Sequence, residues 1–167
     1  MISERSYAPF TVDLLERLAD ISEQSTNEFF AHNPRWLPYK NCLLCVVLAQ
    51  GGALHYVTDS TGVKDLDVWT FYEFQSGLGH FPYRLKHQRD FGRSVFGRHT
   101  ADLGYIGRRV DLFGRSIRRP PGFNAIQTVQ HYLTERKTET SRFLALKPVV
   151  LIEPANRRGE VIHRPKP

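Results

Sequence analysis

The unbroken apolar run LLCVVL at residues 43–48, which ends just before Gly51 and Gly52, constrains the fold more than any other part of the chain. A strand with one face in water alternates apolar and polar side chains, whereas a strand buried on both faces is apolar throughout. The run therefore predicts a central strand that is covered on both sides. A buried helix is the alternative interpretation, because so short an apolar run has no period that separates the two.

Weaker patterns predict other elements around this strand. Apolar residues recur at helical spacing from Thr11 to Phe30 and from Asn124 to Leu133, and both segments are predicted to be helices. Strict alternation from Asp65 to Phe71 predicts a second strand, with the acids on one face and Leu66 and Val68 on the other. The remaining elements expected are a short helix from 53, a strand at 109–113 and a late apolar strand at 149–152.

The chain has the size of one domain. Its 167 residues are 41% hydrophobic, which is enough for a single core. We expect one domain at 1–155 and a solvated, basic, proline-containing tail at 156–167. Pro34 and Pro38 predict a loop, and residues 77–107 show no clean period and are expected to form loops with short elements.

Cysteine usage and hydropathy bear on the cellular compartment. Cys42 and Cys45 are the only cysteines, too few for a disulfide framework, and the first residues lack an apolar signal core. The longest apolar run, from Cys42 to Ala49, is far shorter than the roughly 20 residues of a membrane helix. We therefore expect a cytoplasmic protein with no membrane partner. For the lone C-x-x-C pair, buried packing is favoured over zinc or redox chemistry.

Asp65 and Asp67 are the first candidates for chemistry. Residues two apart on a strand project from the same face, so their carboxylates converge and suit a hard cation such as Mg²⁺. The alternative is an exposed strand face whose acids only meet water. A third carboxylate, Asp111, follows in the apolar frame Val110-Asp111-Leu112-Phe113.

These motifs occur in an order known from one enzyme superfamily. An apolar strand, Gly51-Gly52, a short helix, KDLDV at 64–68 and VDL at 110–112 together resemble the nucleotidyltransferase superfamily related to DNA polymerase beta. The similarity is greatest to its minimal and abortive-infection toxin branches, and it covers roughly residues 43–112. The resemblance implies an α/β (α+β) fold, with a mixed central sheet flanked by helices.

The resemblance also implies roles for particular residues. Asp65, Asp67 and Asp111 would bind the catalytic Mg²⁺ or Mn²⁺, and Asp111 could also act as the base. The nucleotide-binding residues would be Gly51, Gly52, Lys64 and Arg109, although Lys64 has pairing with Asp65 as an equal alternative. The activity implied is transfer of a nucleoside monophosphate from a nucleoside triphosphate to a hydroxyl on RNA, protein or a small molecule, with a toxin–antitoxin role as a candidate context. A non-catalytic nucleic-acid- or protein-binding domain and a metal-dependent nuclease are the alternatives.

The net charge of +6 and the pI of about 9.5 are compatible with an anionic partner, although a soluble surface is the favoured interpretation of the total charge. Basic side chains interleaved with aromatic rings surround Asp111 in sequence, and such mixing suits a nucleic-acid or triphosphate surface. The basic members are Arg84, Lys86, Arg89, Arg93, Arg98, Arg108, Arg109, Arg115, Arg118 and Arg119. Of the histidines, His55 alone lies next to the glycines, and for each of them a surface or packing role is favoured over catalysis.

Overall fold

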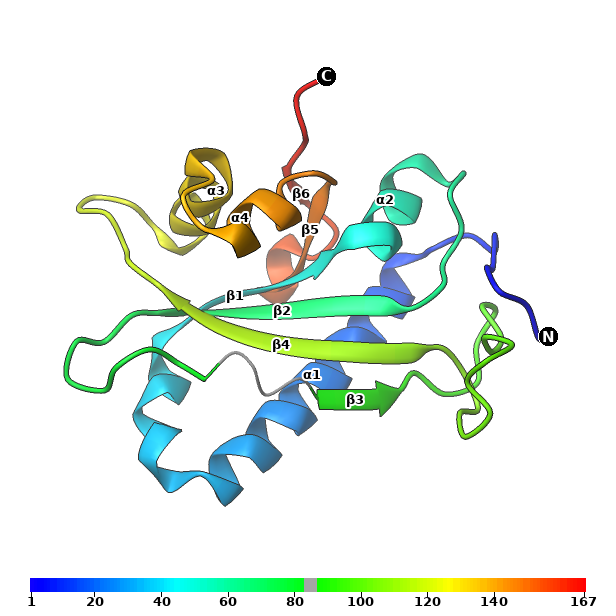
Figure 1. Cartoon of the computed structure of the whole chain (residues 1–167), viewed down its shortest axis with the longest axis horizontal. Coiled ribbons are helices and arrows are strands. Elements are labelled where there is room, and N and C mark those ends of the chain that lie inside the picture. Colours follow the sequence, from blue (N-terminus) through cyan, green and yellow to red (C-terminus); the bar gives the residue numbers. More distant parts are fainter. Residues whose placement is uncertain (83–86) are drawn as a thin grey trace.

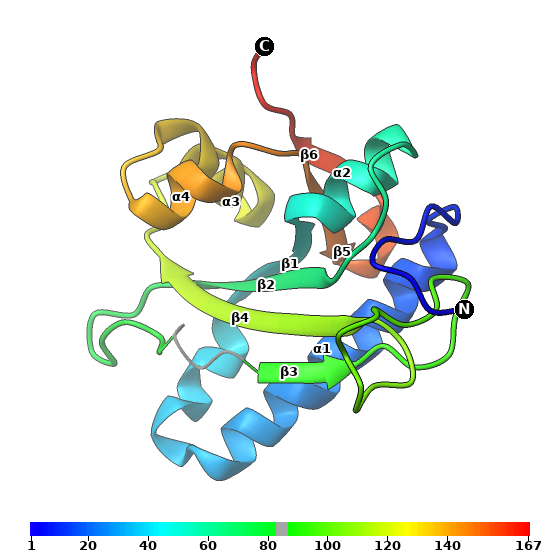
Figure 2. The same ribbon diagram turned by 45° about the vertical axis from the view of Figure 1, so that its right-hand side comes forward.

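The computed structural model describes residues 1–82 and 87–167, and its centre is a mixed sheet of six strands in the order β3-β4-β2-β1-β5-β6. In chain order the elements are α1 (Val12–His32), η1 (Pro34–Cys42), β1 (Leu43–Ala49), α2 (Gln50–Thr58), β2 (Leu66–Glu73), β3 (His87–Asp90), β4 (Arg109–Ile117), α3 (Ala125–Glu135), α4 (Glu139–Leu144), β5 (Val149–Glu153), η2 (Ala155–Arg157) and β6 (Val161–His163). Helix α1 crosses one face of the sheet, and α3 and α4 cover the other (Figures 1 and 2). The predicted α+β class is confirmed.

Strand β1 is covered on both faces, as its apolar run predicts. Val46 and Leu48 pack into the core shared with Leu15 and Leu18 of α1. Cys45, Val47 and Ala49 pack into a second core with Ile126, Val129 and Leu133 of α3. The run is apolar throughout because its alternate side chains pack into two different cores, one on each face of the sheet. The helical alternative for this segment is wrong.

Strands β2 and β4 run parallel, and this pairing matters most for the site. Asp67 of β2 lies directly opposite Asp111 of β4, and Leu66 lies opposite Val110. On the other side of β2, Ala49 of β1 is the antiparallel partner of Asp67. Leu66 and Val68 face the α1 core as predicted, but the strand begins at Leu66, so Asp65 lies in the preceding segment.

The flanking helices follow their sequence signals closely. Thr11 is the N-cap residue of α1 with an extended backbone, although its side chain makes no capping hydrogen bond. Asn124 caps α3 through a capping box with Gln127, in which each side chain bonds the other's backbone N–H. No helix in the described residues is both long and apolar enough to cross a membrane.

Two segments differ from the sequence-based predictions, and a third, which was expected to hold short elements, contains one. The expected loop around Pro34 and Pro38 is the 3₁₀ helix η1. The stretch 77–107 contains strand β3, which pairs antiparallel with β4 at the edge of the sheet. The segment predicted as a solvated tail contains β6, because Ile162 is buried in the α3 core while the neighbouring residues pair with β5.

Arg108, expected among the surface basic residues, is instead fully buried. Its guanidinium donates to the carbonyls of Phe96, Glu4 and Lys64 and to the hydroxyl of Ser3. Through these bonds one side chain joins the N-terminal segment, the residue before Asp65 and the β3–β4 connection. Burial lowers the pKa of Arg108, and the nearby carboxylates of Asp102 and Asp65 oppose that effect.

Candidate functional site

The predicted site residues lie at one end of the central strands, where β1 ends and the parallel strands β2 and β4 begin. Ala49, Asp67 and Asp111 form a row across these three strands. The next residue after Ala49 is Gln50, which opens α2. The paired carboxylates and the start of α2 are thus brought together by strand register.

Arg109 draws two of the acids towards each other. Its Nη2 lies 3.0 Å from Oδ2 of Asp65 and 3.2 Å from Oδ2 of Asp111. Its Nε lies 3.2 Å from Oδ1 of Asp111, and its Nη1 lies 3.8 Å from Asp102. Burial lowers the pKa of Arg109, but the charges of Asp111, Asp65 and Asp102 and the hydrogen bond to Asp111 outweigh burial and raise it above its ordinary value. The guanidinium is therefore held as a cation among carboxylates.

Asp111 is the most buried member of this group, with 2% of its surface exposed. Besides Arg109, it accepts a hydrogen bond of 3.2 Å from Nε2 of Gln88 on β3. Burying a carboxylate costs free energy unless its charge is compensated. For Asp111, Arg109 supplies the opposite charge and Gln88 supplies a hydrogen bond.

The two glycines lie in the first turn of α2, earlier than the helix start expected at Ala53. A Cβ added to Gly52 would come 3.3 Å from Leu66 Cδ2 and 3.7 Å from the carbonyl oxygen of Asp65, whereas one added to Gly51 would meet nothing within 4 Å. Gln50 has a left-handed backbone with φ of 58°, which is uncommon for a non-glycine residue. Gly52 thus permits close packing beside Asp65, while Gly51 borders open space at a helix N-terminus, where unpaired N–H groups favour anions.

A divalent cation can be tested against this donor set. Within residues 1–82 and 87–167, no three His, Cys, Asp or Glu side chains are grouped closely enough to hold a metal by themselves. Mg²⁺, however, is usually bound by one or two carboxylates together with water and substrate phosphates. The bridging guanidinium of Arg109 demonstrates that Asp65 and Asp111 reach one cation. Asp65 and Asp111 are therefore oxygen donors of the kind that Mg²⁺ prefers, placed around one positively charged group.

Other sequence candidates separate into distinct environments. Lys64 is exposed, and in the described part of the chain Asp65 pairs with Arg109 and not with Lys64. His55 is fully buried; its Nε2 bonds the carbonyl of Ala8 and its Nδ1 accepts from the N–H of Gly62, so it joins loops and does not face the acids. Cys42 lies in η1 and Cys45 lies in β1, and both cysteines are free.

The arginines of the predicted basic and aromatic surface also lie in different environments. Arg89 pairs with Glu28 of α1, and Arg108 faces the interior. Arg115 and Arg118 line a cavity under α3. Arg84 and Lys86 lie outside the described residues.

The sequence analysis did not identify two residues whose side chains contact the acid–arginine group. Gln88 and Asp102 both come from the stretch without a clean period, and both reach the acid–arginine group. The four polar residues of β3 show no strand alternation, so only the paired structure reveals Gln88.

Comparisons of the chain with known proteins gave no match. No protein-family model matches the chain, and no curated protein or solved structure is significantly similar to it.

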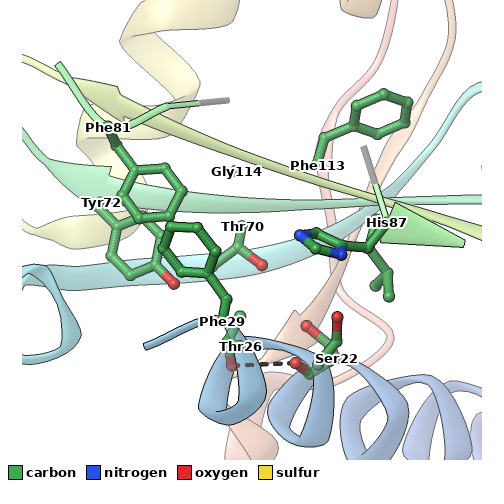
Figure 3. A pocket seen from close by; sticks show the side chains of 11 residues that line it. Ser22, Thr26, Phe29, Thr70, Tyr72, Phe81, His87, Phe113 and Gly114 are labelled. Atoms are coloured by element: carbon green, nitrogen blue, oxygen red, sulfur yellow. Dashed lines mark hydrogen bonds between the residues drawn. The ribbon is translucent and has the colours of Figure 1, made fainter. Parts of the chain in front are cut away.

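A separate, small cavity lies on the opposite face of the sheet, against α1 (Figure 3). Its volume of about 30 Å³ suits a single water molecule. Thr26, Phe29 and Thr70 line it with His87, whose Nε2 is buried and has no hydrogen-bond partner among the described residues. Burial lowers the pKa of His87, Arg89 lowers it further and Glu28 opposes them. The cavity shares no lining residue with the acid group.

Removing the charge of Arg109 is expected to destabilise the fold. In Arg109→Gln, the buried Asp111 loses its cation, and the free energy of unfolding in EDTA should fall by about 2–4 kcal/mol. Arg89→Gln is the matched control, because its pair with Glu28 is more exposed and should contribute no more than about 1 kcal/mol. Urea unfolding of both variants measures the difference, and equal small losses would contradict the compensating role of Arg109.

The lowered pKa of His87 predicts a pH dependence of stability. The unfolded state binds this proton more readily than the folded state, so stability is fully present above the ordinary histidine pKa of about 6.5 and is lost as pH falls below it. His87→Gln should remove this part of the loss, while contributions of the other histidines remain. Urea unfolding from about pH 8 to about pH 5 measures it. Wild-type and variant curves that stay parallel would contradict the assignment.

Proposed function

We propose that this chain is a divalent-metal-dependent nucleotidyltransferase, which moves a nucleoside monophosphate from a nucleoside triphosphate to an acceptor hydroxyl. The observation that carries the proposal is the register of Asp67 with Asp111, placed beside the N-terminal turn of α2 that contains Gly51 and Gly52. Carboxylates for a cation and backbone N–H groups for phosphates are the two parts that such a transfer needs.

In this proposal each residue has a defined task. N–H groups at the start of α2 donate to triphosphate oxygens, and Gly51 leaves room for their approach. Arg109 exchanges its carboxylate partners for phosphate oxygens, which its planar guanidinium binds equally well. Lys64, exposed beside Asp65, adds positive charge near the phosphates.

The chemical step is an in-line displacement at the α-phosphorus. The acceptor oxygen forms a bond to phosphorus, the bond to the β-phosphate breaks, and pyrophosphate leaves. Asp111 accepts the proton of the acceptor hydroxyl and later releases it to solvent. Bound Mg²⁺ or Mn²⁺, held by Asp67 and Asp111 with Asp65 beside them, would supply neutralisation of the triphosphate charge. The two free thiols are compatible with the reducing cytoplasm as the place of this activity.

A non-catalytic nucleic-acid- or protein-binding domain is the second candidate. It is favoured by one observation, namely that Arg109 compensates the charges of Asp65 and Asp111. In that case the acids only hold the edge of the sheet together.

Thermal unfolding with each of ATP, CTP, GTP and UTP, with and without Mg²⁺, separates the two candidates. A ligand that binds only the native state raises the melting temperature, by roughly 5–10 °C at about 100 times its Kd. We expect such a rise with at least one triphosphate, dependent on Mg²⁺ and absent in Asp65→Ala/Asp67→Ala. The matched control is Asp13→Ala/Asp20→Ala, which removes two exposed acids from α1 and should keep the rise. No rise with any nucleotide in the wild type would favour the binding domain.

A further inference from the structure

A second cavity lies on the α1 face of the sheet, beside the small cavity of Figure 3. Its volume is about 300 Å³, and its walls come chiefly from the second half of α1, from η1 and from β1 and β2. Such a volume is at the lower end of the range of small-molecule sites, roughly 300–1,000 Å³. We call it the hydroxyl cavity, because the four residues that it shares with the small cavity all carry hydroxyl groups, namely Ser22, Thr26, Thr70 and Tyr72.

The face of β2 that is turned towards α1 changes from apolar to polar along the strand. Leu66 and Val68 pack into the core that includes α1. Alternate residues of a strand share a face, so Thr70 and Tyr72 follow them on the α1 side. Figure 3 shows both side chains projecting from the sheet towards the helix, and both line the hydroxyl cavity. The hollow therefore begins where the aliphatic part of this face ends.

Helix α1 changes in the same way on the face that it turns to the sheet. Leu15 and Leu18 are fully buried in the core, and further along the helix Ser22 and Ser25 are buried instead. Ser22 lines the hydroxyl cavity, and both serines line the small cavity beside it. Because these helix side chains are small, the space between them and Thr70 is left unfilled. The hollow is thus a consequence of the sequence of both walls.

The hydroxyl groups of this cavity are buried without protein partners. Ser22, Thr70 and Tyr72 expose only 2%, 4% and 2% of their surface. Within residues 1–82 and 87–167, none of these three hydroxyls makes a hydrogen bond, whereas buried polar groups in proteins are normally bonded. Burial raises the pKa of Tyr72, so its hydroxyl keeps its proton and remains a donor. All three hydroxyls are available to an occupant of the cavity.

The charged groups of the cavity lining balance each other. Lys40 and Glu23 are exposed lining residues of opposite sign, and Glu153 pairs with Arg158 at 2.8 Å. An ion buried among hydroxyls would lack an opposite charge, which costs free energy. A hydroxyl of a neutral ligand can both donate to and accept from a protein hydroxyl, and the ring of Phe30 offers an apolar wall to a C–H face. The lining therefore favours an uncharged molecule that is rich in hydroxyls.

We propose that the hydroxyl cavity binds a small, uncharged polyol of the size of a monosaccharide. Its hydroxyls exchange hydrogen bonds with Ser22, Thr70 and Tyr72, and its C–H face lies against Phe30. The ligand displaces water from the cavity, because its hydroxyls offer the same hydrogen bonds. No member of the acid–arginine group lines this cavity, so the site is separate from the proposed transferase site.

The test is ligand-observed NMR with the intact protein. Saturation transfer from the protein to a panel of pentoses, hexoses and inositols identifies a bound member, and a titration gives its Kd. Uncharged nucleosides of similar size form the comparison panel. We expect at least one sugar or inositol to bind and the nucleosides to give no signal. The inference is overturned when no polyol gives a signal, as in a cavity that holds only water, or when nucleosides bind in their place.

Thr70→Val tests whether the bound polyol lies in this cavity. The substitution keeps the shape of the side chain and removes its hydroxyl, so the affinity should fall roughly tenfold. Ser22→Ala should have the same effect and replaces Thr70→Val should that variant fail to fold. The matched control is Thr100→Val, at an exposed threonine outside the cavity, which should leave the Kd unchanged. An equal Kd in all of these variants would place the polyol elsewhere and overturn the inference.

The same variants separate this inference from the proposed transferase function. Asp65→Ala/Asp67→Ala should retain polyol binding, and Thr70→Val should retain any triphosphate-dependent thermal stabilisation, because the two sites share no residue. Loss of polyol binding in the double aspartate variant would contradict a separate site.

Discussion

Parallel pairing of β2 with β4 sets Asp67 directly opposite Asp111 and brings the first residues of both strands to one edge of the sheet. A parallel pair needs a long connection, here the chain from 74 to 108, which returns through the edge strand β3. Buried Arg108 joins the two strand starts, because it precedes β4 and donates to the carbonyl of Lys64 just before Asp65. The geometry of the acid–arginine group therefore depends on the buried, hydrogen-bonded side chain of Arg108.

The electrostatic balance of that edge follows from the same pairing. Carboxylates placed side by side repel each other, and partial burial strengthens the repulsion. Arg109, the first residue of β4, offsets this repulsion because its guanidinium forms ion pairs with both Asp65 and Asp111. The carboxylates are thus compensated by a side chain of the protein itself, and the proposed function would require Arg109 to exchange carboxylate oxygens for phosphate oxygens. Of the two glycines at the start of α2, Gly51 borders open space, whereas Gly52 packs closely beside Asp65.

Sequence reasoning predicted the elements that have a local sequence pattern and missed those that depend on distant partners. The apolar β1, the alternating β2 and the capped α3 were all predictable, because each obeys a local rule of periodicity or capping. Strand β3 and strand β6 were not, since their few residues acquire strand structure only by pairing with β4 and β5. At the site, the spacing of Asp65 and Asp67 suggested convergence, but the pairing of Asp67 with Asp111 and the roles of Gln88 and Arg108 required the register of the whole sheet.

The most direct measurement is the position of Mn²⁺, located by its anomalous scattering in crystals grown with a non-hydrolysable triphosphate. The account predicts an anomalous peak in contact with the carboxylates of Asp67 and Asp111, triphosphate oxygens at the first turn of α2, and the guanidinium of Arg109 moved from Asp65 onto phosphate. A crystal with triphosphate and Mn²⁺ in excess, in which Arg109 still bridges Asp65 and Asp111 and no peak lies beside them, would contradict it.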